Sequence, residues 1–167
     1  MDAMEAILTR RSIRKYTAQP VPDEVIKELL QAAMAAPSAR NQQDWYFVVV
    51  RNRKTLDELG KAHPYAPVKG APLAILVCGD LQREVSKGFW VQDCAAATQN
   101  LLLAAHAKGL GAVWCGCYPR EERVSALRQV LGLPEHLVPL ALVVIGYPAE
   151  RKSREDRYDP AKVRVID

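Results

Sequence analysis

The segment Phe89–Lys108 constrains the fold more than any other part of this chain. It is rich in alanine and leucine, and few charged residues follow Asp93. This composition predicts one long helix that is apolar on nearly every side, and such a helix is usually buried. A chain of 167 residues forms a core of limited size, so we expect this helix to be buried partly against a second subunit.

Helical and strand periodicities alternate along the rest of the chain. They predict helices at residues 2–10, Asp23–Ala35, Thr55–Ala62 and Arg120–Leu131, and strands at Trp45–Val50, Leu73–Cys78, Leu110–Tyr118 and Leu137–Gly146. Strands separated by helices indicate a central sheet flanked by helices, of the α+β or the α/β class. No repeat or linker interrupts the chain, so we expect one domain over residues 1–167, ending in a charged, extended tail at 149–167.

Composition narrows the class of protein. Apolar residues make up 49% and charged residues 25%, which is ordinary usage for a soluble domain. The net charge of +4 is modest and no basic-aromatic stripe is present, so a nucleic-acid binder is disfavoured. The N-terminus carries acids and no apolar stretch of signal length, and the apolar runs are too short to span a bilayer. A cytoplasmic location without membrane contact is therefore expected.

The residues that usually form metal or nucleophilic sites are scattered. The cysteines lie in apolar runs and are expected to be small buried hydrophobes: Cys78, Cys94, Cys115 and Cys117. No cysteine or histidine pair has zinc-like spacing, so no metal is predicted. Neither a GxGxxG nor a GxxxxGK[ST] motif occurs. Because no side chain stands out as an acid, base or nucleophile, the chemistry is better assigned to a bound cofactor.

Two polar segments contrast with this apolar background. The basic segment, residues 10–16, reads RRSIRKY, and its arginines and serine suit an anion such as phosphate. If it is extended, Arg10, Ser12 and Arg14 face one side. The polar loop, residues 37–43, reads PSARNQQ and offers mixed donors and acceptors that suit a flat heterocycle. Each also has a structural interpretation: a solvated basic turn at a helix end, and a loop that caps a helix.

A third segment is rich in glycine. Residues 109–119 read GLGAVWCGCYP, and glycines there allow a planar ligand to approach main-chain N–H groups. The alternative is a tight helix-to-strand turn followed by a glycine inside a strand.

Taken in order, these segments resemble the FMN-dependent nitroreductase family. The resemblance rests on RRSIRKY, APSARNQQDWYFVVV, the run from FWVQDC to GCYP, GLPEHLVPLALVVIGYPAE and RYDPAKVRV, and it covers nearly the whole chain. It implies an α+β fold in which helices flank a mostly antiparallel central sheet as a three-layer sandwich. It also implies an obligate homodimer that holds FMN at its interface, with the helix 89–108 as the dimer helix.

The resemblance assigns roles to residues of this chain. The flavin-contacting basic residues would be Arg10, Arg11, Ser12 and Arg14, of which Arg10 and Ser12 would hold the phosphate and Arg14 the pyrimidine edge of the ring. The residues that contact the ring and the ribityl chain would come from the partner subunit, and they would be Pro37, Ser38, Ala39, Asn41 and Gln43. The backbone facing the reactive part of the ring would belong to Trp114, Cys115, Gly116 and Cys117. Either Lys162 or Arg164 would close on the phosphate.

Two features depart from the family pattern. The family usually reads Asn-x-Gln-Pro-Trp, whereas this chain has Asp44 in place of the proline, which removes a backbone constraint and adds a negative charge near the predicted site. The chain also lacks a longer helical insertion over the pocket, which suggests an open pocket and broad substrate tolerance.

The activity implied by the resemblance is a two-step exchange. NADPH or NADH gives hydride to FMN, and an electron-poor acceptor such as a nitroaromatic or a quinone is then reduced at the same site, with no catalytic side chain beyond Arg14 as a charge stabiliser. The alternative function is a flavin carrier or redox sensor without useful turnover, and Asp44 is the feature that favours it.

Overall fold

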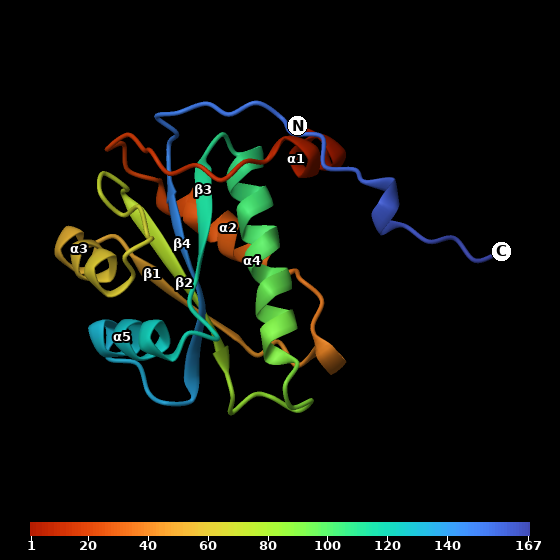
Figure 1. The fold of residues 1–167 in the computed structure, drawn as a ribbon. Coiled ribbons are helices and arrows are strands. Elements are labelled where there is room, and N and C mark those ends of the chain that lie inside the picture. The colour runs from red at the N-terminus through yellow and green to blue at the C-terminus, as the bar shows by residue number, and fades with distance from the viewer.

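The computed structural model describes residues 1–167 and places a central sheet between two layers of helices (Figure 1). The strands are β1 (Trp45–Val50), β2 (Leu73–Asp80), β3 (Gly111–Gly116) and β4 (Leu137–Gly146). Their order in the sheet is β1-β2-β4-β3, and every neighbouring pair is antiparallel. The four predicted strands are confirmed, and the antiparallel pairing decides between the two fold classes in favour of α+β.

The helices also lie where the periodicity predicts them. They are α1 (Ala3–Thr9), α2 (Asp23–Met34), α3 (Arg53–Ala62), α4 (Trp90–Ala107) and α5 (Glu121–Leu131), with short 3-10 turns η1 (Ala39–Asn41) and η2 (Pro160–Lys162). Helix α3 begins two residues earlier than predicted because the side chain of Asn52 accepts the N–H of Thr55 at 3.0 Å. No helix combines the length and the apolar character needed to cross a membrane.

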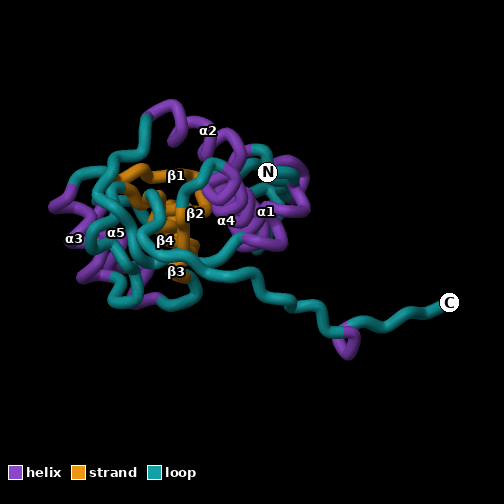
Figure 2. The backbone as a smooth tube through the Cα atoms, turned by 90° about the horizontal axis from the view of Figure 1, so that it is seen from above, coloured by secondary structure: helices purple, strands orange, loops and turns teal.

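Strand β2 is buried on both faces, which explains its unbroken apolar sequence. Its odd-numbered side chains from Leu73 to Val77 pack with α2 and α4, and its even-numbered ones from Ala74 to Cys78 pack with α3 and α5. Figure 2 shows the same division, with α4 and α1 on one side of the strands and α3 and α5 on the other. The three-layer sandwich is therefore confirmed.

Helix α4 covers the sheet with only one of its faces. Cys94, Ala97 and Leu101 on that face are fully buried. The opposite face forms an apolar groove with α1 and α2, whose lining includes Ile7, Ala32 and Leu103. The periodicity assigns three apolar side chains to one side of α1: Met4, Ile7 and Leu8. All three are exposed, because nothing within one chain covers them.

The basic segment crosses the end of the sheet where two paired glycines have no side chains to obstruct it. Gly111 of β3 lies opposite Gly146 of β4, and a Cβ at Gly111 would come within 2.6 Å of Ile13. A Cβ at Gly146 would come within 3.1 Å of the ring of Tyr16. The side chains of Ile13 and Tyr16 are buried there, so the glycines fix where the N-terminal segment lies.

We predict that Gly111→Ala destabilises the protein by about 1–3 kcal/mol, because the added methyl group overpacks against Ile13. The matched control is Gly116→Ala on the same strand, where a Cβ meets nothing within 4 Å. Chemical denaturation of both variants measures the difference. Equal stabilities would show that the basic segment is not fixed by this contact.

Candidate functional site

The basic segment is extended and lies beside the edge strand β3. The N–H of Ile13 donates to the carbonyl of Ala112 at 3.0 Å, and Ser12 forms a parallel bridge with the same residue. The hydroxyl of Tyr16 donates to the carbonyl of Val144 at 3.1 Å. These bonds hold the main chain, and they leave Arg14 exposed on the surface with no side-chain hydrogen bond or ion pair in the chain.

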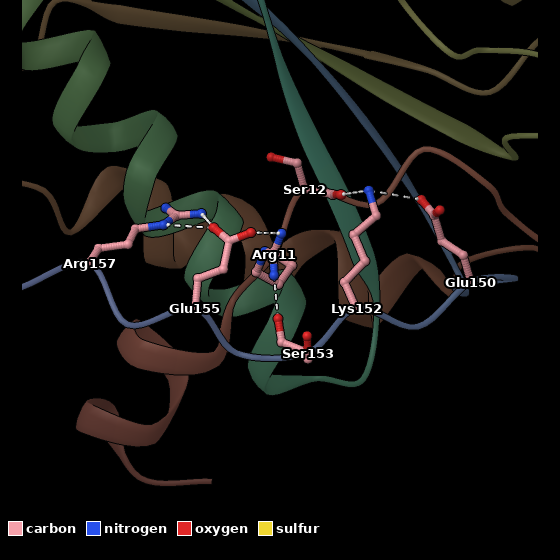
Figure 3. Close-up of polar contacts among 7 residues, drawn as sticks. All are labelled: Arg11, Ser12, Glu150, Lys152, Ser153, Glu155 and Arg157. Carbon is pink, nitrogen blue, oxygen red and sulfur yellow. Dashed lines mark hydrogen bonds and ion pairs between the residues drawn. The ribbon is translucent and has the colours of Figure 1, made fainter.

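The tail covers the basic segment and pairs with part of it (Figure 3). The guanidinium of Arg11 donates to the Ser153 carbonyl and to Glu155, the latter at 2.6 Å. Lys152 donates to the carbonyl of Ser12 at 2.7 Å, and the N–H of Arg14 donates to Glu150. The charge of Arg11 is thus compensated within the chain, which the sequence did not indicate.

Positive charge is nevertheless in excess where α1, the basic segment and the tail meet. A pocket beside α1 is lined by four arginines, which include Arg10 and Arg157, but by only two carboxylates. Burial, followed by repulsion from Arg157 and Arg11, lowers the pKa of Arg10. An anion bound in this pocket would relieve that repulsion, so the pocket suits a phosphate group.

The polar loop has a strained backbone. Three residues other than glycine adopt left-handed conformations, with φ of 50° at Arg40, 54° at Asn41 and 48° at Gln43. Such conformations cost about 1–2 kcal/mol each, and they cluster where a structure presents side chains to a ligand. Ser38 supports the turn, because its hydroxyl accepts the N–H of Gln43 at 3.0 Å. Asn41 and Gln43 are exposed and hydrogen-bond to each other at 2.9 Å.

The anchor of the polar loop is Gln42, which the sequence reasoning did not assign to the site. Its amide nitrogen donates to Asp44 at 2.9 Å and to Asp93 of α4 at 2.7 Å. Its oxygen accepts the N–H groups of Val85 and Ser86 at 2.8 Å and 2.9 Å. Asp93 was identifiable as an isolated acid in an apolar helix, and its carboxylate also accepts the N–H of Ala39 at 2.9 Å.

The segment 114–117 forms the end of β3, an edge strand. Main-chain groups alternate in direction along a strand, and the N–H of Cys117 points to β4, where it donates to Leu140. The amide groups of Trp114 and Gly116 therefore point to the open edge. No atom lies within 4 Å of a Cβ placed on Gly116, so the space over the face of the sheet at this strand end is free for a flat ligand.

The two cysteines of this segment are packing residues, as predicted. Cys115 and Cys117 lie on one face and are buried with α3 and α5. Burial raises the pKa of Cys115 to about 11 and that of Cys117 to about 12, so both are neutral thiols near pH 7. The Gly116 carbonyl accepts hydrogen bonds from His63 and Arg123, each at 2.9 Å. These two side chains fix the strand end and were not predicted.

One chain brings only part of the predicted site together. Ser12 lies at Ala112, four residues before Gly116 along β3, or about 13 Å. The polar loop precedes β1, at the opposite edge of the sheet. It is bonded to the first turn of α4 through Asp93, whereas the basic segment follows Thr9, which bonds His106 in the last turn at 2.8 Å. Asp93 and His106 are thirteen residues apart in α4, which separates the two attachments by about 20 Å.

The remaining predicted residues lie elsewhere. Pro37, Ser38 and Ala39 border a shallow pocket against the first turns of α4. Lys162 and Arg164 belong to the part of the tail that extends away from the body (Figure 1), where Lys162 pairs only with Asp159. Asp44 is fully buried beneath the polar loop, so its charge lies under the predicted ligand-facing surface and not on it.

Comparisons with known proteins point to one family. The sequence model of the Nitroreductase family matches residues 7–67 and 62–147. A Methanothermobacter thermautotrophicus protein provisionally named NADH dehydrogenase/NAD(P)H nitroreductase is 52% identical over 99% of this chain and 87% of its own length.

Solved structures agree with this assignment. A Parabacteroides distasonis protein with the same provisional name superposes with a TM-score of 0.94 at 42% identity, covering 98% of this chain and 97% of that one. A Desulfovibrio desulfuricans protein, provisionally named a nitroreductase and solved in complex with FMN, has a TM-score of 0.86 at 34% identity. The superposition covers 100% of this chain and 98% of the Desulfovibrio chain.

We predict that Arg40→Gly is more stable than Arg40→Ala by about 1 kcal/mol, because glycine adopts the left-handed conformation of residue 40 without strain. Both variants remove the same exposed side chain, so the difference isolates the backbone. Thermal or urea unfolding of the two variants measures it. A glycine variant no more stable than the alanine variant would contradict the strain.

Proposed function

The chain belongs to the nitroreductase family and is an NAD(P)H-dependent oxidoreductase, and from this premise we propose that it binds FMN and reduces electron-poor acceptors such as nitroaromatics and quinones. The observation that carries the proposal is the position of the basic segment and the end of β3 along one edge of the sheet. An excess of positive charge lies at one end of that edge, and at the other end Gly116 leaves the face of the sheet uncovered beside the outward-pointing amides of Trp114 and Gly116.

The residues present fit FMN. The phosphate would lie near Arg10 and Ser12, where arginines are in excess. The flat ring would lie against the end of β3, since Gly116 has no side chain to obstruct it and the amides of Trp114 and Gly116 point to the open edge. Trp114, Cys115 and Cys117 would contribute their backbone there, while the thiols stay in the core.

A second copy of the chain would complete the site. Residues Pro37, Ser38, Ala39, Asn41 and Gln43 would come from the partner, because α4 keeps the attachment of its own polar loop about 20 Å from that of its own basic segment. The apolar groove between α1, α2 and α4 would be covered in such a homodimer. The extended tail would bring Lys162 or Arg164 to the phosphate, and residues 1–167 would form one FMN-binding domain.

In the proposed mechanism the protein orients the reactants and supplies fixed charge. Bound FMN would supply the hydride-transfer chemistry between NADH or NADPH and the acceptor, and this chain's residues would offer donor and acceptor the same place in turn. Arg14 would face the pyrimidine edge, where a fixed positive charge stabilises the negative charge of hydride uptake. Its guanidinium has no partner in the chain, so it is available for this role.

Arg10 and Arg14 are expected to act at opposite ends of the flavin, which gives a paired prediction. Arg10→Ala should weaken FMN binding by about tenfold or more through the phosphate and leave riboflavin binding nearly unchanged. Arg14→Ala should weaken both ligands and also slow flavin reduction by NAD(P)H. Fluorescence titration and stopped-flow absorbance measure these effects. Unchanged affinity and rate in Arg14→Ala would exclude its role.

The function itself is tested by the visible spectrum of the purified protein with FMN, in the absence of air, during addition of NADPH and then NADH. Bleaching of a bound-flavin band is the expected result, and oxidation of the donor that continues when a quinone is added would establish turnover. A bound band that stays yellow with both donors would instead favour the flavin carrier or sensor. The absence of any bound band would overturn the site assignment.

A further inference from the structure

Beneath the polar loop lies a pair of buried carboxyl groups with no basic partner. Asp44 is fully buried and Asp93 is 5% exposed. Both accept hydrogen bonds from the same nitrogen of Gln42, at 2.9 Å and 2.7 Å. Two acceptors held by one amide are close together, and their mutual repulsion in a buried site is large if both are ionised.

The surroundings do not compensate this charge. Asp93 and Cys94 face Asp44 from α4, and Glu84 contributes a further negative charge from the loop before α4. Asp80 of β2 donates its N–H to the main-chain carbonyl of Asp44, while its own carboxylate is paired with Arg83. One side-chain oxygen of Asp44 has no hydrogen-bond partner at all. A buried, uncompensated carboxylate is costly, and protonation is the simplest way to remove that cost.

We propose that Asp44 is a positioning residue, which shares one proton with Asp93 and through Gln42 holds the strained backbone that presents Asn41 and Gln43. The proton comes from solvent and is bound between the two carboxyl groups, so that one donates to the other. When it is lost, two like charges lie beneath the loop and only the Gln42 amide holds them together.

The expected titration follows from the position of Asp44. Burial, then the charge of Asp93, raises the pKa of Asp44 to about 6, against about 3.9 for an unfolded chain. The folded protein therefore binds the proton more tightly than the unfolded chain, and this group stabilises the fold below about pH 4. That stability is lost as the pH rises to about 6. The loop should accordingly be tightest in mild acid.

The first measurement compares unfolding of the wild-type protein with Asp44→Asn, which keeps an uncharged acceptor for Gln42. The ratio of their unfolding constants, wild type over variant, should rise about tenfold per pH unit between roughly pH 4 and 6, and about a hundredfold in all. Asp57→Asn, which removes an exposed carboxylate on α3, is the matched control and should show no such step. A ratio independent of pH would overturn the proposal.

Asp93→Asn separates a shared proton from simple burial of Asp44. It removes the neighbouring charge, so the step should move to lower pH. A step that stays in place would show that Asp44 titrates alone and that the proton is not shared.

The positioning role is read from hydrogen exchange at the Gln43 N–H, which donates to Ser38. The exchange rate of the wild type relative to Asp44→Asn should rise severalfold as the pH passes about 6, and the ratio cancels the intrinsic pH dependence of exchange. A constant ratio would overturn the positioning role. None of these readouts needs flavin. The inference rests on the proposed function only because it treats the polar loop as part of an FMN site. If the protein failed to bind FMN, the proposed function would be overturned, but the shared proton and its effect on the loop would not.

Discussion

The length of helix α4 determines how a site can be assembled from this chain. Its last turn is bonded to the residue before the basic segment through His106, and its first turn is bonded to the polar loop through Asp93. The thirteen residues from Asp93 to His106 keep these attachments about 20 Å apart. Within one chain the two segments are therefore held apart, and in the proposed homodimer the apolar groove along the same helix would be the surface on which the second chain lies.

The polar loop shows how the chain holds a backbone that its residues do not favour. Left-handed conformations at Arg40, Asn41 and Gln43 would relax if the loop were free. They persist because Gln42 uses both hydrogen-bonding groups of its amide on buried or main-chain partners. The exposed amides beside it are thus fixed before any ligand arrives, which lowers the entropy lost on binding.

Sequence patterns predicted the elements well because their signals are local. The apolar run of β2 and the periodicity of α2 each follow from burial of a single element. The antiparallel strand order was not predictable from these patterns, because strands separated by helices suit parallel and antiparallel pairing alike. Contacts between distant segments were also missed: the pairing of Arg11 with Glu155, and the fixing of Gly116 by His63 and Arg123. The sequence predicts that the polar loop faces a ligand, but it does not distinguish the anchor Gln42 from its exposed neighbours.

Asp44 illustrates two physical solutions to one structural requirement. Proline, which the resemblance to the family gives as the expected residue at this position, would fix the chain entering β1 through its ring, and that constraint is independent of pH. An aspartate has no such ring, and here the same stretch is held by hydrogen bonds that converge on buried carboxyl groups. A constraint of this kind depends on protonation, because the charge that attracts the Gln42 amide also repels Asp93. The rigidity of the loop is therefore covalent where proline is present, whereas in this chain it is electrostatic and responds to the solution.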